Sequence, residues 1–233
     1  MIYGIFRKFL VKRQSFDALF LEYSQLKALV ASTLSLSSAH LQDFWISSVF
    51  GSQRGFFVEF GGFDGKTVSN TYSLEKNYGW KGIVVEPGRS FRVSLEANRQ
   101  CELDFRAIWN VTGDEIVFKE DTIEGYLSVA AEDELIGTKN SFSEYKVETV
   151  TLFDLLKQYR APKEIEYISV DIEGSELRVL EAFFKENDFF NVKCWTVEHN
   201  FRNSKSDLEK LFSLHGYKAV HKELSYRDYW FKK

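Results

Sequence analysis

Four segments of the sequence that have the composition of buried strands each end on an acidic side chain. These acids are Glu59, Glu86, Asp171 and Glu198, and His199 follows the last of them. In an open parallel sheet, ligands bind beyond the carboxyl ends of the strands, near the point where the strand order reverses. One acid at a strand end is ordinary, but acids at four strand ends predict a site. Carboxylates there can accept hydroxyl donors, take up a proton or bind a hard cation.

A glycine-rich turn follows the first of these strands. The apolar run 56–60 leads into the turn 61–65, and a helix is expected after it. Strand, glycine turn and helix together let a ligand approach bare backbone. Counted from the first glycine, the third and sixth positions are Phe63 and Lys66, so the dinucleotide fingerprint GxGxxG is not met. A nicotinamide cofactor is therefore disfavoured, and the sequence contains no P-loop pattern.

Glu86 indicates a nucleoside ligand. It lies about 20 residues beyond the turn, at the end of the second strand, where an acid is expected to accept hydrogen bonds from a ribose diol. An acid and a glycine turn after strand one, followed by an acid that ends strand two, are the pattern of S-adenosylmethionine (SAM) binding in seven-stranded methyltransferases. We therefore predict a SAM site over the glycine turn.

The elements that position these residues alternate between strand and helix from residue 55 onward. Strands are expected at 56–60, 83–86, 102–108, 115–119, 146–150, 167–172 and 193–198, with a terminal hairpin at 217–220 and 229–232. Helices are expected at 69–78, 90–98, 151–159, about 176–186 and 206–215. Nearly continuous apolar strands between helices predict a parallel sheet that is covered on both faces. The predicted fold class is α/β, a Rossmann-like seven-stranded class I methyltransferase sheet with a helical N-terminal extension. The predicted domains are a helical cap at 1–53 and a SAM-dependent methyltransferase domain at 54–233.

Several motifs occur in a fixed order along the chain. They are VEFGGFDG at 58–65, SNT at 69–71, GWKG at 79–82 with VEP at 85–87, VETVTL at 147–152 and SVDIEGSE at 169–176. This set resembles the FkbM family of SAM-dependent methyltransferases over about residues 55–220. The resemblance implies methyl transfer to a hydroxyl, typically on a sugar or a polyketide-type natural product. One departure is Phe63, which stands where the common GxGxG pattern has its central glycine.

The predicted cofactor-binding residues lie at the strand ends and on the glycine turn. They are Glu59, Gly61, Gly62, Asp64, Gly65, Ser69, Asn70, Glu86, Pro87, Arg106, Ala107 and Asp171. A buried carboxylate such as Glu59 needs a partner, either the amino group of the cofactor or nearby backbone. Ser69 and Asn70 either reach the methionine carboxylate or cap the helix that follows.

The predicted catalytic residues are Asp171 and His199, because an alcohol is a poor nucleophile until a base takes its proton. An ordinary histidine pKa suits this role near neutral pH, whereas Asp171 needs a raised pKa or a metal partner. Asp171 and Glu198, with Asn200, also offer oxygen ligands for magnesium, which stays open as a second cofactor.

The predicted acceptor contacts are Glu173, Glu176, Tyr126 and Ser128. The irregular stretch 120–145 is the expected lid over the acceptor. For Glu176 the alternative is a structural role in the first turn of a helix, where acids are favoured.

Composition narrows the choice of partners. The net charge of −4 gives no signature of nucleic-acid binding, so a small-molecule or glycan acceptor is expected. The two cysteines form no CxxC pair, which favours a reducing compartment, and we predict a cytoplasmic protein. No apolar run is long enough for a transmembrane helix, although the basic, apolar N-terminus leaves weak peripheral membrane contact open. The oligomeric state also stays open, and the alternative function is a catalytically silent Rossmann-like module that binds a partner.

Overall fold

The computed structural model describes residue 30 and residues 34–121, 128–130, 142–200, 204–225 and 227–233. In chain order its elements are α2 (Gln42–Phe50), β1 (Phe56–Phe60), α3 (Tyr72–Tyr78), β2 (Lys81–Val85), α4 (Arg92–Asn98), β3 (Glu102–Asp104), β4 (Ala107–Ile108), β5 (Glu115–Asp121), β6 (Ser128–Ala130), β7 (Phe142–Val150), α5 (Leu152–Gln158), β8 (Glu164–Val170), α6 (Glu176–Glu186), β9 (Asn191–Glu198), α7 (Lys205–Leu214), β10 (Lys218–Val220) and β11 (Asp228–Lys232).

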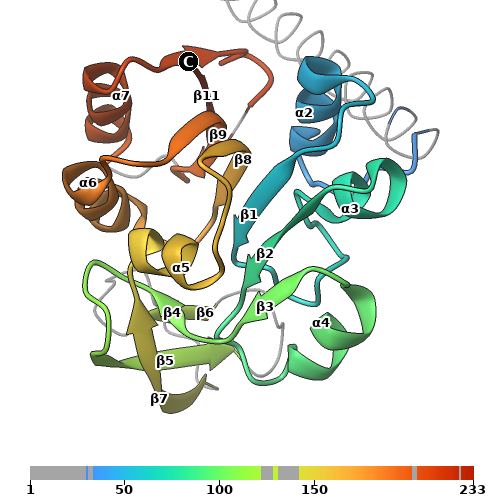
Figure 1. The fold of residues 1–233 in the computed structure, drawn as a ribbon. Helices are drawn as coiled ribbons and strands as arrows, with labels where there is room; N and C mark the ends of the chain where they lie inside the picture. Colours follow the sequence, from blue (N-terminus) through green and yellow to red (C-terminus); the bar gives the residue numbers. More distant parts are fainter. Residues whose placement is uncertain (1–29, 31–33, 122–127, 131–141, 201–203, 226) are drawn as a thin grey trace, which may run out of the picture. The chain divides into compact units, whose positions relative to one another are not determined.

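The main sheet has seven strands in the order β10-β11-β9-β8-β1-β2-β3 (Figure 1). Strand β1 pairs in parallel with both β2 and β8, and β8 pairs in parallel with β9. Strand β11 is antiparallel to both β9 and β10. After β1 the chain adds β2 and β3 on one side of it, and it later returns to add β8 and β9 on the other side. The carboxyl ends of β1 and β8 therefore lie at the switch point of strand order. The predicted α/β fold with a seven-stranded sheet is confirmed.

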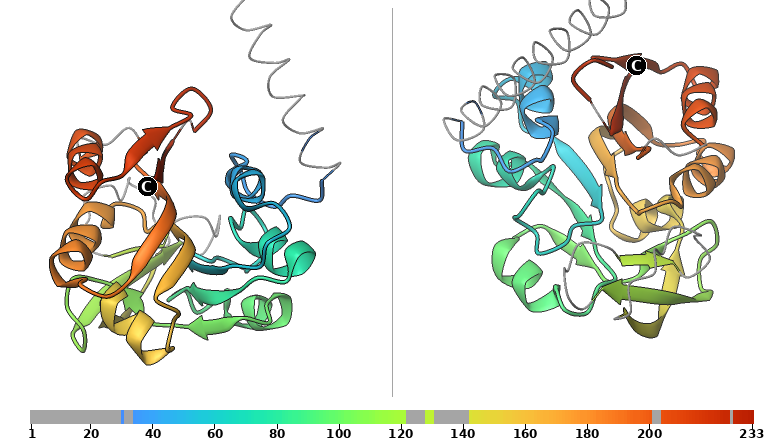
Figure 2. Two further views of the ribbon diagram at one scale, coloured as in Figure 1. Left: turned by 45° about the horizontal axis from the view of Figure 1, so that its top comes forward. Right: turned by 180° about the vertical axis from the view of Figure 1, so that it is seen from behind.

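Helices cover both faces of this sheet, α5, α6 and α7 on one face and α2, α3 and α4 on the other (Figures 1 and 2). Alternation along β1 explains this arrangement, since successive side chains of a strand point to opposite faces. Val58 and Phe60 pack in the core beneath α5–α7, while Phe57 packs with Trp45 of α2 and Leu74 of α3. Both sides of the strand are therefore buried, as its apolar composition predicts.

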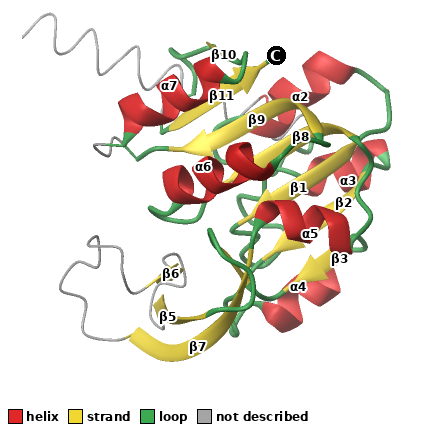
Figure 3. Cartoon of the chain, turned by 60° about the vertical axis from the view of Figure 1, so that its left-hand side comes forward, coloured by secondary structure: helices red, strands yellow, loops and turns green. Residues whose placement is uncertain are grey.

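A second sheet of four strands, in the order β4-β7-β5-β6, lies beside the β3 edge of the first (Figure 3). Strands β5 and β7 form its long antiparallel pair, at the positions of the expected strands 115–119 and 146–150. The prediction of one strand over 102–108 is wrong, because β3 pairs with β2 whereas β4 pairs with β7 of the second sheet. A local turn separates the two strands: the backbone N–H of Arg106 donates to Asp104 Oδ1 at 2.9 Å.

Three helices, α3, α4 and α7, begin at other residues than predicted, α4 at Arg92 rather than at residue 90, while α5 and α6 begin as predicted. Helix α3 starts at Tyr72 rather than at Ser69, because Ser69 Oγ accepts a hydrogen bond from the Tyr72 N–H at 3.1 Å and so precedes the first turn. Helix α7 starts at Lys205, one residue before the expected serine cap. Helix α5 has the predicted cap, since the Thr151 hydroxyl accepts from the Asp154 N–H.

The N-terminal region falls largely outside the described residues. Helix α2 belongs to the compact unit Ser37–Lys233, together with the sheet. The division into a cap at 1–53 and a domain at 54–233 stays a prediction.

Candidate functional site

A cavity of about 140 Å³ lies at the carboxyl ends of β1, β2 and β8. Its lining includes Gly61 and Phe63 of the glycine turn, Glu86 after β2, and Asp171 and Glu173 after β8. The cavity therefore brings together residues from three separate parts of the sequence at the edge where parallel sheets bind ligands.

The glycines of the turn are required by the packing of the protein itself. Gly61 has a φ of 75°, and a Cβ there would lie 2.0 Å from the backbone oxygen of Asp171. A Cβ on Gly62 would lie 2.2 Å from Val84 Cγ1. These distances are far below van der Waals contact, so glycine lets the turn pack against the end of β8 and against β2.

Phe63 forms part of the cavity wall. Its φ of 50° is uncommon for a residue with a side chain. The Phe63 N–H donates to Glu86 Oε2 at 2.9 Å, and its ring packs against Phe91 with the centroids 4.2 Å apart. Phe63, which stands where the common pattern has a glycine, thus contacts both Glu86 and the ring of Phe91 at the cavity.

Glu86 is buried, with only 5% of its surface exposed. Its two carboxyl oxygens accept from the backbone N–H groups of Phe63 and Gly88, the latter at 2.7 Å. Burial, together with the negative charges of Glu120 and Glu59, outweighs these two bonds and raises the pKa of Glu86 to about 7. Each carboxyl oxygen keeps a second lone pair, so the group can still accept a hydrogen bond from a ligand hydroxyl.

Glu59 lies beneath the turn in a buried polar network. Its carboxylate accepts from the Asn70 N–H at 2.6 Å, from the Thr71 hydroxyl at 2.5 Å and from Ser69 Oγ at 2.8 Å. Arg99 Nη1 lies 3.2 Å from Glu59 Oε2. The nearby-backbone partner expected for Glu59 is thus present, and its contact with a cofactor stays a prediction.

The other predicted residues of the turn also have local partners. Asp64 Oδ1 accepts from the N–H groups of Lys66 and Thr67, which closes an exposed turn. Asn70 donates from Nδ2 to Ser169 Oγ at 2.8 Å, while its buried Oδ1 has no hydrogen-bond partner among the described residues. Asn70 therefore retains an acceptor beside the turn.

Arg106 and Ala107 are adjacent in sequence but lie in different environments. Ala107 and Pro87 line the cavity, whereas Arg106 lines a separate groove and binds Asp104 through its guanidinium at 2.5 Å. The predicted strand is interrupted at this point, which explains why the two residues line different hollows.

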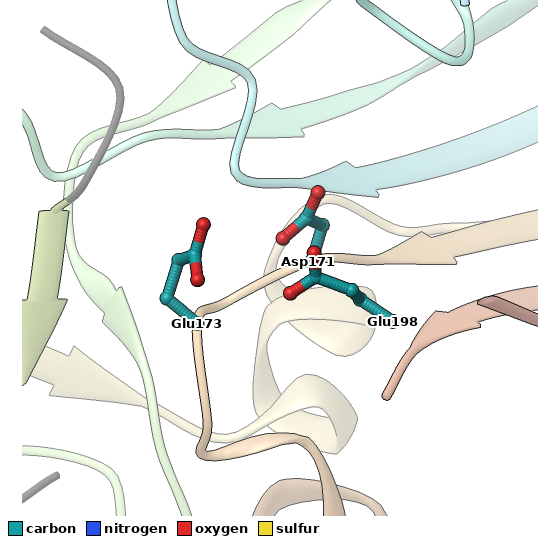
Figure 4. A group of neighbouring side chains, drawn as sticks. All are labelled: Asp171, Glu173 and Glu198. Atoms are coloured by element: carbon teal, nitrogen blue, oxygen red, sulfur yellow. The ribbon is translucent and has the colours of Figure 1, made fainter. Parts of the chain in front are cut away.

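Three carboxyl groups meet beside the cavity (Figure 4). Asp171, Glu173 and Glu198 each offer an oxygen atom, and these atoms all lie within 4.8 Å of one another. Asp171 and Glu198 come from the ends of β8 and β9, which pair in parallel, and Glu173 follows in the turn before α6 with a φ of 58°. Burial, followed by the charges of Glu198 and Glu173, raises the pKa of Asp171 well above its ordinary value. Such a cluster takes up a proton readily, and its oxygen ligands suit a hard divalent cation.

His199 is buried and its ring contacts that of Tyr229, with the centroids 4.9 Å apart. Burial, assisted by the positive charge of Lys205, lowers the pKa of His199 to about 4. The ring is therefore a weaker base near neutral pH than an ordinary histidine, and the cavity lining includes Asp171 but not His199. Its catalytic role stays a prediction.

The predicted acceptor residues have different positions. Glu173 lines the cavity, while Glu176 is buried and accepts from the N–H groups of Ile172 and Gly174 through Oε1. This matches the structural alternative for Glu176. Ser128 lies in β6, its side chain outside the described part, and Tyr126 lies outside the described residues altogether.

Two features of the site were not found from the sequence. Arg99 is buried and donates to Gly65 O as well as to Glu59, so it holds the turn from below. Trp109 and Phe118, from the second sheet and its connection, form an aromatic wall of the cavity. An isolated arginine after a short helix gives no sequence signal, and the aromatic wall depends on how the second sheet packs.

Residues 59–224 match the methyltransferase FkbM domain. The chain belongs to the FkbM methyltransferase family. The resemblance inferred from the ordered motifs is confirmed, and the match contains the glycine turn, Glu86 and all three clustered acids. The family match thus assigns a methyltransferase domain to this chain. Among the described residues, no helix has the length and apolar character needed to cross a membrane.

Two solved structures resemble the FkbM chain in three dimensions. The METTL16 MTase domain has a TM-score of 0.46 at 10% identity, and the alignment covers 81% of this chain and 64% of that domain. A precorrin-6y C5,15-methyltransferase from Geobacter metallireducens GS-15 has a TM-score of 0.43 at 9% identity, covering 82% of this chain and 85% of that one. No curated protein matches the sequence.

The residues at the cavity fit SAM chemically. Glu86 offers carboxyl oxygens to a diol, and Phe63 and Phe91 offer aromatic faces to a flat base. Asn70 lies beside the turn and does not line the cavity.

Proposed function

We propose that this FkbM protein methylates a hydroxyl oxygen of a sugar or glycan. The observation that supports this most is that one cavity is lined both by Glu86, the candidate ribose ligand, and by Asp171 and Glu173, the candidate groups for the acceptor. A methyl donor and a hydroxyl must meet at van der Waals distance, so both sets of contacts need to lie in one cavity.

Glu86 and Pro87 would hold the nucleoside end of SAM, and the Gly61 turn with Asn70 would hold its amino-acid end. Bound SAM supplies an activated methyl group. Phe63 and Phe91 present apolar surface where a flat base can pack and exclude water. Glu59 supports this arrangement from below through its bonds to Ser69 and Asn70.

Asp171 would act as the general base. A carboxylate oxygen of Asp171 would take up the proton that the acceptor hydroxyl gives up. Burial, followed by the charges of Glu198 and Glu173, raises the affinity of Asp171 for that proton. Glu173, half-buried at the cavity wall, would accept hydrogen bonds from neighbouring hydroxyls of the acceptor, and Trp109 and Phe118 would pack against the apolar faces of its ring.

Magnesium stays a prediction for the same carboxylates, with Glu173 joining Asp171 and Glu198. A cation would lower the pKa of an acceptor hydroxyl directly, which replaces the proton-accepting role of Asp171. The two roles separate by experiment: a chelator such as EDTA abolishes transfer in the magnesium case and leaves it unchanged in the proton case.

The test of the proposed function is methyl transfer from labelled SAM into a panel of polysaccharide fragments and simple glycosides. We expect label in an ether that resists base, with S-adenosylhomocysteine formed in equal amount. Calorimetry should show that SAM binds the intact protein and that Glu86→Ala weakens binding by about 100-fold, as the loss of a charged acceptor for two hydroxyls implies.

The matched control is Glu181→Gln, which removes an exposed carboxylate on α6. SAM binding without transfer to any hydroxyl acceptor would favour the catalytically silent module instead. Absence of SAM binding by the intact protein would overturn the proposal.

A further inference from the structure

A second hollow, of about 460 Å³, lies between α4, the β3–β4 connection and β7. We call it the basic groove, because four of its lining residues are cations: Arg89, Arg92, Arg106 and Lys146. Glu148 is the acid that lines it. This charge contrasts with the net charge of −4 of the whole chain.

Two of these cations have no carboxylate partner within the described part of the chain. The Arg89 guanidinium lies over the Tyr145 ring at 4.0 Å, and the Arg92 guanidinium lies over the Phe105 ring at 3.8 Å. Arg106 and Lys146, by contrast, pair with Asp104 and Glu115. The charges that line the groove are therefore only partly compensated by the protein.

Stacking on an aromatic ring prepares a guanidinium for an anion. The ring restrains the plane of the guanidinium, while N–H donors at its edge stay available. Arg89 uses one nitrogen, Nη2, to donate to Lys146 O at 3.4 Å. Arginine side chains held in this way bind phosphate oxygens through paired hydrogen bonds, and less side-chain entropy is lost because the geometry is already set. Two such groups beside Lys146 match the charge and the many oxygens of a phosphate or a diphosphate better than those of a single carboxylate.

The basic groove adjoins the methyl-transfer cavity. Pro87 lines both, and the backbone N–H of Arg89 donates to the Tyr145 hydroxyl at 3.0 Å, which in turn donates to Glu120 at 2.7 Å. Glu120 is one of the two acids whose charge raises the pKa of Glu86. A molecule that occupies the cavity can therefore extend a group past Pro87 into the groove.

We propose that the basic groove binds a phosphate or diphosphate group of the acceptor, so that the substrate is a phosphorylated sugar or a sugar carried on a diphosphate. The anion site itself is independent of methyl transfer, while its assignment to the acceptor rests on the proposed function.

The experiment is calorimetric titration of the full chain with pyrophosphate, glucose 1-phosphate and uncharged glucose, at constant ionic strength and without SAM. We expect pyrophosphate to bind to one site and to bind more tightly than glucose 1-phosphate, with no binding of glucose. The double variant Arg89→Ala/Arg92→Ala should weaken pyrophosphate binding by about tenfold or more. Arg89→Lys/Arg92→Lys keeps both positive charges but loses the paired N–H donors of the guanidinium groups. Its affinity for pyrophosphate should therefore lie between those of the intact protein and the double alanine variant.

The matched control is Arg54→Ala/Lys81→Ala, which removes the same charge from exposed positions at the amino ends of β1 and β2. It should bind pyrophosphate like the intact protein, and all three double variants should keep the SAM affinity of the intact protein. In the transfer assay, groove variants should raise KM for a phosphorylated acceptor and leave kcat unchanged.

Equal loss of pyrophosphate binding in the groove and control variants would overturn the proposal, as would its absence in the intact protein. Single-stranded RNA that binds far more tightly than pyrophosphate, and that loses affinity in the groove variants, would assign the groove to nucleic acid and overturn it too. Since pyrophosphate is titrated without SAM, failure of the methyl-transfer assay leaves the anion site standing, and the two proposals fail separately.

Discussion

Glu86 shows how much one buried carboxyl group can depend on its neighbours. Its two backbone hydrogen bonds favour the ionised form, yet burial and the nearby acids favour the protonated form more strongly. The resulting pKa of about 7 places the change of charge in the neutral range. A ribose diol donates its hydroxyl hydrogens, so it prefers the ionised carboxylate.

SAM binding should therefore depend on pH through Glu86. Because the pKa is raised to about 7, the carboxylate is mostly ionised at about pH 8 and mostly protonated at about pH 6. We expect the SAM dissociation constant to rise by about tenfold over this interval as pH falls. Calorimetry across the range checks this, and Glu86→Ala should bind weakly with a flatter profile. The same pH dependence in both proteins would contradict the assignment.

Asp171→Asn separates catalysis from binding. The amide keeps the shape of the side chain but cannot take up the acceptor proton, so methyl transfer should fall by about 100-fold or more. SAM affinity should change little, because Glu86 and the glycine turn remain. The measurement is kcat with labelled SAM beside a SAM titration. Full activity in Asp171→Asn would remove Asp171 from the reaction, and the same test on His199→Gln would then decide for or against the histidine.

At the scale of elements, the glycine turn is held by the end of α4. Asn98 Nδ2 donates to Asp64 O at 2.8 Å, and Arg99 Nη1 donates to Gly65 O at 3.2 Å. Arg99 also binds Glu59 and Glu75, and its side chain is fully buried. Helix α4 thus fixes a turn more than thirty residues before it, through charge-assisted hydrogen bonds.

Arg99→Met should be strongly destabilising. It leaves the buried carboxylate of Glu59 without its cation and Glu75 with Lys76 alone, which costs about 3–5 kcal/mol. Denaturant unfolding measures this loss, and Glu96→Gln on the exposed side of the same helix should change stability by less than about 0.5 kcal/mol. The double variant Arg99→Met/Glu59→Gln should lose less than the sum of the two single variants, because the substituted amide carries no charge that needs a cation. Simple additivity would mean that the pair does not interact.

The whole compact unit has two cores that share a single sheet. Side chains of β1, β2, β8, β9 and β11 contribute to both cores. Neither helical layer can keep its core if the sheet is lost. The unit 37–233 should therefore unfold as one cooperative body.

Large-to-small substitutions in the two cores test this. Phe57→Ala lies in the core beneath α2–α4 and Phe183→Ala in the core beneath α5–α7, and both side chains are fully buried. Each should cost about 3–5 kcal/mol. Far-UV circular dichroism and tryptophan fluorescence should give coincident unfolding curves for both variants. Separate transitions for the two probes in either variant would show that the layers unfold independently.

Patterns that are local in sequence were sufficient to predict the fold class and the part of the site formed by the glycine turn and Glu86. Apolar runs such as 56–60 require burial on both faces, so they predict a parallel sheet between helices, and the spacing of Glu86 from the turn follows from one strand–helix–strand unit. The order of the motifs was sufficient for the family. Each of these inferences uses neighbours along the chain, where the geometry of a strand or a helix fixes the distance.

Tertiary structure alone decided the rest, because it depends on contacts between residues that are distant in the chain. The strand predicted at 102–108 was split by a hydrogen bond between Asp104 and Arg106 and by pairing of β4 with β7. The pKa of Glu86 depends on burial and on the nearby charge of Glu120, and that of His199 on burial and on Lys205. The glycine at position 61 proved necessary because the backbone of Asp171 passes 2.0 Å from where its Cβ would lie. The sequence by itself determined which residues stand at the strand ends, and folding decided which of them meet, since burial and charge act through space and not along the chain.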